Sequence, residues 1–206
     1  GELAVIVGPN GAGKSTVMRV LLGMLEATAG SVTLDGKDIS MLSTQDRISQ
    51  GLAFVPQTKN VFPSMTVEEN LQMGGFIRKD DISSTIEEVY ELFPILYEKR
   101  KQLAEQLSGG QRQQVAFGRA MMTKPSVMLL DEPTAGVSPI VMDEIFSNIL
   151  DVRNAGMAVL MVEQNAQQAL NIADKGFVLV SGRNEHTGTG KELINDPEVR
   201  KKFLGG

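Results

Sequence analysis

A glycine-rich loop near the start of the sequence constrains the fold more than any other stretch. It comprises, in order, Gly8, Pro9, Asn10, Gly11, Ala12, Gly13, Lys14, Ser15 and Thr16. The apolar run at 3–7 before it suits a buried parallel strand. After it, Val17, Leu21, Leu22 and Leu25 recur at the spacing of one helical face. Strand, glycine loop and helix in this order predict a loop that binds phosphate.

The residue types in this loop suit a triphosphate. Glycine permits unusual φ values and close approach, so consecutive backbone N–H groups can point at phosphate oxygens. The N-terminus of the following helix adds the positive end of its dipole. We expect Lys14 to reach the β and γ phosphates and the Ser15 hydroxyl to ligate Mg²⁺. A glycine-rich turn that binds nothing is the alternative, and the flanking elements argue against it.

Composition narrows the possible classes of protein. A chain of 206 residues suits one domain, or one domain with a small subdomain. Its net charge of −5, with acids and bases interspersed, gives no basic face for nucleic acid. The absence of cysteine excludes a disulfide framework. No apolar run approaches the roughly 20 residues of a membrane-spanning helix, so we expect any membrane role to come through a partner.

Strand and helix patterns alternate along most of the chain. We expect strands at 30–36, 52–56, 127–130, 158–162 and 177–180, and helices at 46–50, 139–154, 166–173 and, in short pieces, 191–204. The polar stretch 182–190 holds the only histidine, His186, and is expected to be a solvated loop. Repeated βα units predict a parallel, doubly wound sheet flanked by helices.

Residues 66–123 interrupt this alternation and are expected to form an inserted helical subdomain within one domain spanning 1–206. Thr66 and Glu69 have the spacing of a capping box. Ser84 and Glu87 suggest a second box, which would open a helix from 84 to 104. Because the first strand starts at residue 3 without an initiator methionine, we expect the sequence to be a fragment that lacks the start of its domain.

Two carboxylates, Asp131 and Glu132, follow the apolar strand at 127–130. In an open α/β sheet, ligands bind at this carboxyl end of the strands. Asp131 suits Mg²⁺, directly or through water. Glu132 suits a general base that polarises the attacking water. Without the upstream glycine loop the pair would indicate an acidic turn; with that loop the pair indicates a phosphoryl-transfer site.

A second glycine-rich motif begins at Leu107. Ser108 and Gln111 have capping-box spacing, so Ser108 should begin a helix that runs to Met122. Gly109 and Gly110 leave the first N–H groups bare, which makes an anion site. An ordinary N-cap is the alternative. Since one chain needs only one phosphate-binding terminus, we hypothesise that this one serves the nucleotide of another subunit.

With these motifs in this order, the sequence resembles the nucleotide-binding subunits of ABC transporters over essentially its whole length. Residues 8–16 match the Walker A loop, 107–111 the signature motif, and 127–132 Walker B with its catalytic glutamate. Gln57 matches the Q-loop glutamine, and 135–138 occupy the D-loop. The resemblance implies that ATP and Mg²⁺ are bound, with Ser15, Gln57 and Asp131 near the metal.

The same resemblance implies an architecture. We expect a P-loop NTPase of the α/β class, with a mostly parallel sheet flanked by helices. The inserted helical subdomain and the remnant of a small antiparallel β-subdomain would complete it.

Within the family, the stretches 131–139, 162–166 and 199–205 look most like ATPases of branched-chain and hydrophobic amino-acid importers. Related urea and amide importers look similar. A non-transport ABC ATPase acting on nucleic acid or ribosomes, and a binding-only module, are further alternatives. The acidic, compact chain argues against the first of these, and Glu132 argues against the second.

The resemblance also implies partners. A second ATPase subunit, identical or different, would share two ATP molecules with this one, each between Walker motifs and a signature. Two transmembrane permease subunits would hold the pair at the cytoplasmic face of the membrane, with an indirect link to an extracytoplasmic solute-binding protein. No nucleic-acid partner is expected. Residues 59–63 and the helical insertion would form the docking surface, although Phe62 could equally be a core residue.

Three positions depart from the family pattern. Gln164 stands where a histidine usually contacts the γ-phosphate; an amide can hydrogen-bond phosphate but cannot be cationic, so we expect slower hydrolysis. Ser138 replaces the usual D-loop aspartate and, with Pro139, suits the start of a helix. The aromatic residue that stacks on adenine would precede residue 1, so we expect weaker ATP binding, by on the order of 1–3 kcal/mol.

Overall fold

The structure, a computed structural model, describes residues 1–204 and is built on a six-stranded sheet of order β4-β5-β6-β1-β7-β8. The parallel strands are β1 (Leu3–Val7), β4 (Leu52–Val55), β5 (Val127–Asp131), β6 (Ala158–Glu163) and β7 (Lys175–Val180). The last strand, β8 (Arg183–Gly188), is antiparallel to β7. A separate antiparallel pair joins β2 (Thr33–Leu34) to β3 (Lys37–Asp38). The expected α/β class and mostly parallel sheet are therefore confirmed.

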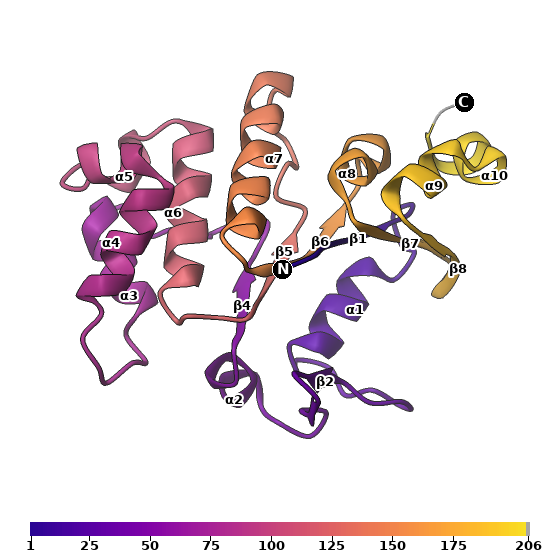
Figure 1. The fold of residues 1–206 in the computed structure, drawn as a ribbon, viewed down its shortest axis with the longest axis horizontal. Helices are drawn as coiled ribbons and strands as arrows, with labels where there is room; N and C mark the ends of the chain where they lie inside the picture. The colour runs from indigo at the N-terminus through magenta and orange to yellow at the C-terminus, as the bar shows by residue number, and fades with distance from the viewer. Residues whose placement is uncertain (205–206) are drawn as a thin grey trace.

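Helices cover both faces of the sheet. Figure 1 shows α1 (Lys14–Leu21) and α2 (Thr44–Ser49) on one side, with α7 (Pro139–Asn154), α8 (Ala166–Ile172) and α9 (Gly190–Asn195) on the other. The chain continues through α10 (Pro197–Val199) and a π-helical turn (Arg200–Leu204). Gly205, the last residue of the similar stretch 199–205, lies outside the described residues. None of the helices in the described chain has both the length and the apolar character that a membrane span requires.

The strand order decides where the loops meet. β6 lies between β5 and β1, and the register pairs Val7 with Glu163 and Asp131 with Val162. The three strands are parallel, so their carboxyl ends lie at one edge of the sheet. The glycine loop after β1 and the loops after β5 and β6 therefore face one ligand-binding edge.

All regular elements between β4 and β5 are helical. They are α3 (Val67–Gly74), α4 (Ser83–Leu92), α5 (Pro94–Glu98), a 3₁₀ turn (Ala104–Gln106) and α6 (Gly109–Met121). Their core includes Leu71, Leu96 and Phe117, which are fully buried. The helices cross closely at Gly118, where an added Cβ would lie 2.8 Å from side-chain carbons of Leu71 and Val89.

Two predictions about these helices are corrected. The capping box of Thr66 and Glu69 is present, but the second box is not, because α4 begins at Ser83 with no side-chain cap. The single helix expected from 84 to 104 is broken at Phe93, since Pro94 has no N–H to continue it.

Two predictions about the sheet layer are also corrected. His186 lies in β8, opposite Val178, and not in a loop. A polar sequence suits this position because an edge strand is half exposed to water. In α1 the fully buried apolar positions are Met18 and, just after the helix, Leu22, whereas Leu25 is exposed.

Candidate nucleotide site

The glycine loop has a backbone that other residues could not easily adopt. Gly8 has φ +153°, and a Cβ there would lie 2.1 Å from the carbonyl oxygen of Leu179. Gly13 caps α1 with φ +103°. The turn between β7 and β8 supports the loop, because Gly182 N–H donates to the Ala12 carbonyl at 2.9 Å. The first turn of α1 holds no acidic side chain, so its N-terminus keeps its attraction for anions.

Lys14 places a buried positive charge in this loop. Its side chain is only 5% exposed, and Nζ donates to the carbonyl oxygens of Gly8 at 2.8 Å and Pro9 at 3.3 Å. Within residues 1–204, no carboxylate lies in ion-pair contact with this ammonium. A cation bound only by neutral carbonyls can still attract an anionic ligand strongly.

Asp131 and Glu132 differ in environment. Burial raises the pKa of the Asp131 carboxyl, and the positive charges of Arg19 and Lys14 oppose that rise. Glu132 has φ +46°, a left-handed conformation uncommon for a residue with a side chain, and its N–H donates to the Val162 carbonyl at 2.9 Å. Backbone strain of this kind concentrates at functional sites.

Amide side chains from three other loops converge near Glu132. Gln57 Nε2 lies 3.4 Å from Glu132 Oε2, and Gln164 Nε2 lies 3.5 Å from Glu132 Oε1. Gln164 Nε2 also donates to Asn10 Oδ1 at 3.0 Å. The structure thus brings together the glycine loop, the loop after β4 and the loops after β5 and β6 around one carboxylate.

Three of the residues expected near a metal have side-chain oxygens that suit Mg²⁺. Ser15, Gln57 and Asp131 supply a hydroxyl, an amide oxygen and a carboxylate, the donor types that this ion prefers. In the part of the chain that is described, no group of three or more His, Cys, Asp or Glu side chains could hold a metal. Mg²⁺ is usually bound by one or two protein ligands together with substrate phosphates and water.

The second glycine-rich motif lies elsewhere. Ser108 caps α6, accepting from Gln111 N–H at 3.2 Å, while Gln111 Oε1 accepts from Ser108 N–H at 3.2 Å. Gly110 follows Gly109 in the first turn, and its Cα lies against the Glu144 carboxylate of α7. Across residues 1–204, no side-chain hydrogen bond joins 108–111 to 8–16, and Figure 1 shows α6 well apart from α1. The motif is not brought to the phosphate loop of its own chain.

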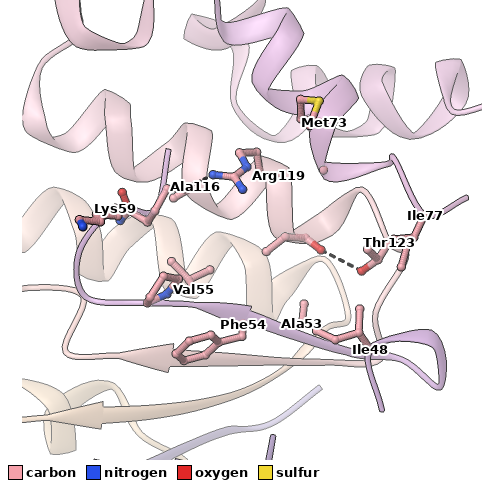
Figure 2. Close-up of a pocket in the computed structure, with 14 residues that line it drawn as sticks. Ile48, Ala53, Phe54, Val55, Lys59, Met73, Ile77, Ala116, Arg119 and Thr123 are labelled. Atoms are coloured by element: carbon pink, nitrogen blue, oxygen red, sulfur yellow. Dashed lines mark hydrogen bonds between the residues drawn. The ribbon is translucent and has the colours of Figure 1, made fainter. Parts of the chain in front are cut away.

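A groove of about 270 Å³ lies between β4, α3 and α6 (Figure 2), and its lining includes none of residues 8–16. Arg119 of α6 crosses it, with Nη1 donating to the Asn60 carbonyl at 2.6 Å and the guanidinium 4.4 Å from the Phe62 ring centre. Burial lowers the pKa of Arg119. Phe62 is 38% exposed, so the alternative that it is a core residue is wrong.

Sequence reasoning missed one buried acid beside the site. Glu163 ends β6 and accepts hydrogen bonds from Thr134 and Gln164. The available signal was the same as for Asp131, a carboxylate directly after an apolar strand. Ser138 does occupy the N-cap position of α7, with Pro139 following, but its side chain makes no capping hydrogen bond.

Comparisons with known proteins agree with this geometry. A family model described as ABC transporter matches residues 1–135. The chain is 44% identical to the high-affinity branched-chain amino acid transport ATP-binding protein BraG of Pseudomonas aeruginosa, covering 100% of this chain and 89% of that protein. It is 40% identical to the probable branched-chain amino acid transport ATP-binding protein LivF of Archaeoglobus fulgidus, covering 99% and 87%.

A solved structure is also similar. The ADP conformation of an ATP-binding cassette from an ABC transporter has a TM-score of 0.88 and 30% identity, covering 100% of this chain and 88% of that one.

Proposed function

Because this chain belongs to the ABC transporter family, we propose that it is the ATP-hydrolysing subunit of an importer for branched-chain or other hydrophobic amino acids. The observation that carries the hydrolytic part is that the Gln57 and Gln164 amides reach the two oxygens of Glu132, while Gln164 also bonds Asn10 of the glycine loop. The amino-acid part draws on the similarity to BraG and LivF. A urea or amide importer is the alternative substrate class.

The site residues have distinct proposed roles. Lys14 and the N-terminus of α1 bind the β and γ phosphates. Ser15, Gln57 and Asp131 would hold Mg²⁺, and the bound ion would supply neutralisation of phosphate charge. Glu132 accepts the proton of the attacking water, and the amides of Gln57 and Gln164 orient its two oxygens. Gln164 also places a neutral donor beside the phosphate loop.

The separation of the two glycine-rich motifs supports a two-subunit site. Residues 108–111 begin α6 with no phosphate loop of their own chain beside them, and Gly110 is buried against the Glu144 carboxylate. We propose that they contact the nucleotide held by residues 8–16 of a second ATPase subunit.

The groove crossed by Arg119 supports a permease contact. Its lining includes Met73 and Ile77, which are exposed. The loop after β4 also lines it through Lys59 and Asn60, and this loop continues to Phe62. A groove with apolar side chains and two cations, Lys59 and Arg119, suits a short amphipathic segment of a transmembrane partner. We propose that this contact holds the subunit at the cytoplasmic face of the membrane.

Two measurements test the hydrolytic part. MgATP titration of the wild type and Lys14→Ala should show binding that the variant loses. Turnover in Glu132→Gln should fall by about 10²–10⁴-fold while MgATP still binds, because only proton transfer is removed. Equal turnover in Glu132→Gln and the wild type would refute the role of Glu132. Uptake of labelled leucine, compared with urea, by vesicles carrying the assembled transporter would decide the substrate class.

A further inference from the structure

Glu163 is a buried carboxylate whose role the motifs do not explain. It is the last residue of β6 and only 1% exposed. Within the described residues no cation forms an ion pair with it. Burial raises the pKa of its carboxyl, and hydrogen bonds from Thr134 oppose that rise. A buried carboxylate without a counter-charge is costly, so a specific set of donors must hold it there.

The two oxygens of Glu163 bind two different loops. Oε1 accepts from the Thr134 peptide N–H at 3.0 Å and from the Thr134 hydroxyl at 2.7 Å. Oε2 accepts from the Gln164 peptide N–H at 3.1 Å. Thr134 belongs to the loop after β5 that begins with Glu132, and Gln164 begins the loop after β6. One side chain therefore joins the backbones of both loops beneath the site.

We infer that Glu163 is a positioning residue for ATP hydrolysis, fixing the loop of Glu132 relative to the loop of Gln164. The inference rests on the hydrolytic function proposed above. Gln164 reaches Glu132 at 3.5 Å and Asn10 at 3.0 Å only while its backbone is held in place. Catalytic groups must be held to within about 0.5 Å of productive geometry, and buried hydrogen bonds beneath them provide this.

A carboxylate suits this position better than an amide. The groups that bond to Glu163 are the N–H and hydroxyl of Thr134 and the backbone N–H groups of Gln164 and Asn165; all are donors, and an ionised carboxylate is purely an acceptor. Glutamine has the same shape but carries one acceptor oxygen and one donor nitrogen. In Glu163→Gln, the NH₂ group would face either Thr134 or Gln164, so one loop loses its attachment.

The first test is steady-state ATPase activity of the assembled transporter. For Glu163→Gln we expect kcat to fall by about tenfold to hundredfold, as for an unpaired buried donor. KM for MgATP should stay within about twofold, because Lys14 and the glycine loop bind the phosphates separately. Thr134→Val should lower kcat, whereas Thr134→Ser, which keeps the hydroxyl, should match the wild type. The double variant Glu163→Gln/Thr134→Val should lose less kcat than the product of the two single losses, because both changes weaken one connection between the loops.

The second test is amide hydrogen exchange, which needs no turnover. Protection of the Thr134 and Gln164 amides should fall in Glu163→Gln, while the strand amides of β1 keep theirs. Unchanged protection, unchanged kcat, or losses that multiply in the double variant would each overturn the inference.

Controls separate this inference from simpler explanations. Val152→Ala removes buried volume in α7, away from the site, and should lower the melting temperature without lowering kcat. If it lowers kcat as much as Glu163→Gln does, a stability loss explains both and the inference fails. If Glu163→Gln does not fold, the pair Thr134→Val and Thr134→Ser decides the question. Wild-type turnover that Lys14→Ala leaves unchanged would instead refute the proposed function.

Discussion

Replacing Arg47 with methionine tests how the helix that follows the phosphate loop is held. The side chain is 3% exposed. Its Nη1 donates to the carbonyls of Val20 at 2.7 Å and Leu21 at 2.8 Å, at the end of α1. Its Nε donates to Leu42 at 3.1 Å and its Nη2 to Ser40 at 2.6 Å. One guanidinium therefore joins α1, α2 and the segment after β3.

The expected cost follows from the acceptors that lose their partner. Four carbonyls would lose a hydrogen bond in Arg47→Met, at about 1 kcal/mol each, and methionine keeps most of the apolar stem. We therefore expect a loss of about 4 kcal/mol from the free energy of unfolding. That is a large share of the roughly 5–15 kcal/mol typical of a domain. Arg47→Lys keeps the charge but not the planar fork, so about half of this loss should remain.

The assay is urea unfolding followed by circular dichroism at pH 7. The midpoint should shift while the slope stays constant, since both variants unfold the same surface. Arg183→Met, at an exposed position in β8, is the matched control and should change stability by less than about 0.5 kcal/mol. A loss below about 1 kcal/mol in Arg47→Met, with an unchanged slope, would refute the argument.

Two further predictions concern turnover and acid stability. Gln164→His should raise kcat by about tenfold at pH values where the imidazole is protonated, because a charged donor binds phosphate oxygen more strongly than a neutral amide. The assay should cover about pH 5.5–8, which spans the usual histidine pKa. A kcat equal to or below that of the wild type across this range would contradict the prediction. The hydrogen bond from Arg78 lowers the pKa of Asp80 from 3.8 to about 2, so the folded chain binds that proton less tightly than the unfolded chain. The resulting contribution to the free energy of unfolding is fully present at pH values well above the ordinary pKa of 3.8, and it is lost as the pH falls towards about 2. The difference in urea midpoint between the wild type and Asp80→Asn should therefore be constant near neutral pH and shrink in acid; a difference that grows in acid would contradict the assigned sign.

Local patterns were sufficient for many elements of the fold. The helix expected at 139–154 has those bounds, because Ser138 and Pro139 mark its start and the apolar stripe continues to its end. The apolar runs before the site became buried strands, since buried parallel strands are apolar on both faces. Local patterns gave wrong predictions where a single residue ended a helix or where a strand lay at the edge of the sheet. Pro94 divided an expected helix, and the polar strand β8 had no apolar pattern to reveal it.

The site shows the same division. The sequence by itself predicted the chemistry from a loop suited to phosphate, a pair of carboxylates after a strand, and a second glycine-rich helix start. Such motifs depend on backbone freedom, capping and residue type over a few positions, and these are local properties. The tertiary structure alone decided that Gln57 and Gln164 meet at Glu132, that Gln164 also bonds Asn10, and that Glu163 holds the Gln164 backbone. Strand order sets those contacts, and it arises from burial of the whole sheet, which no single stretch of sequence encodes.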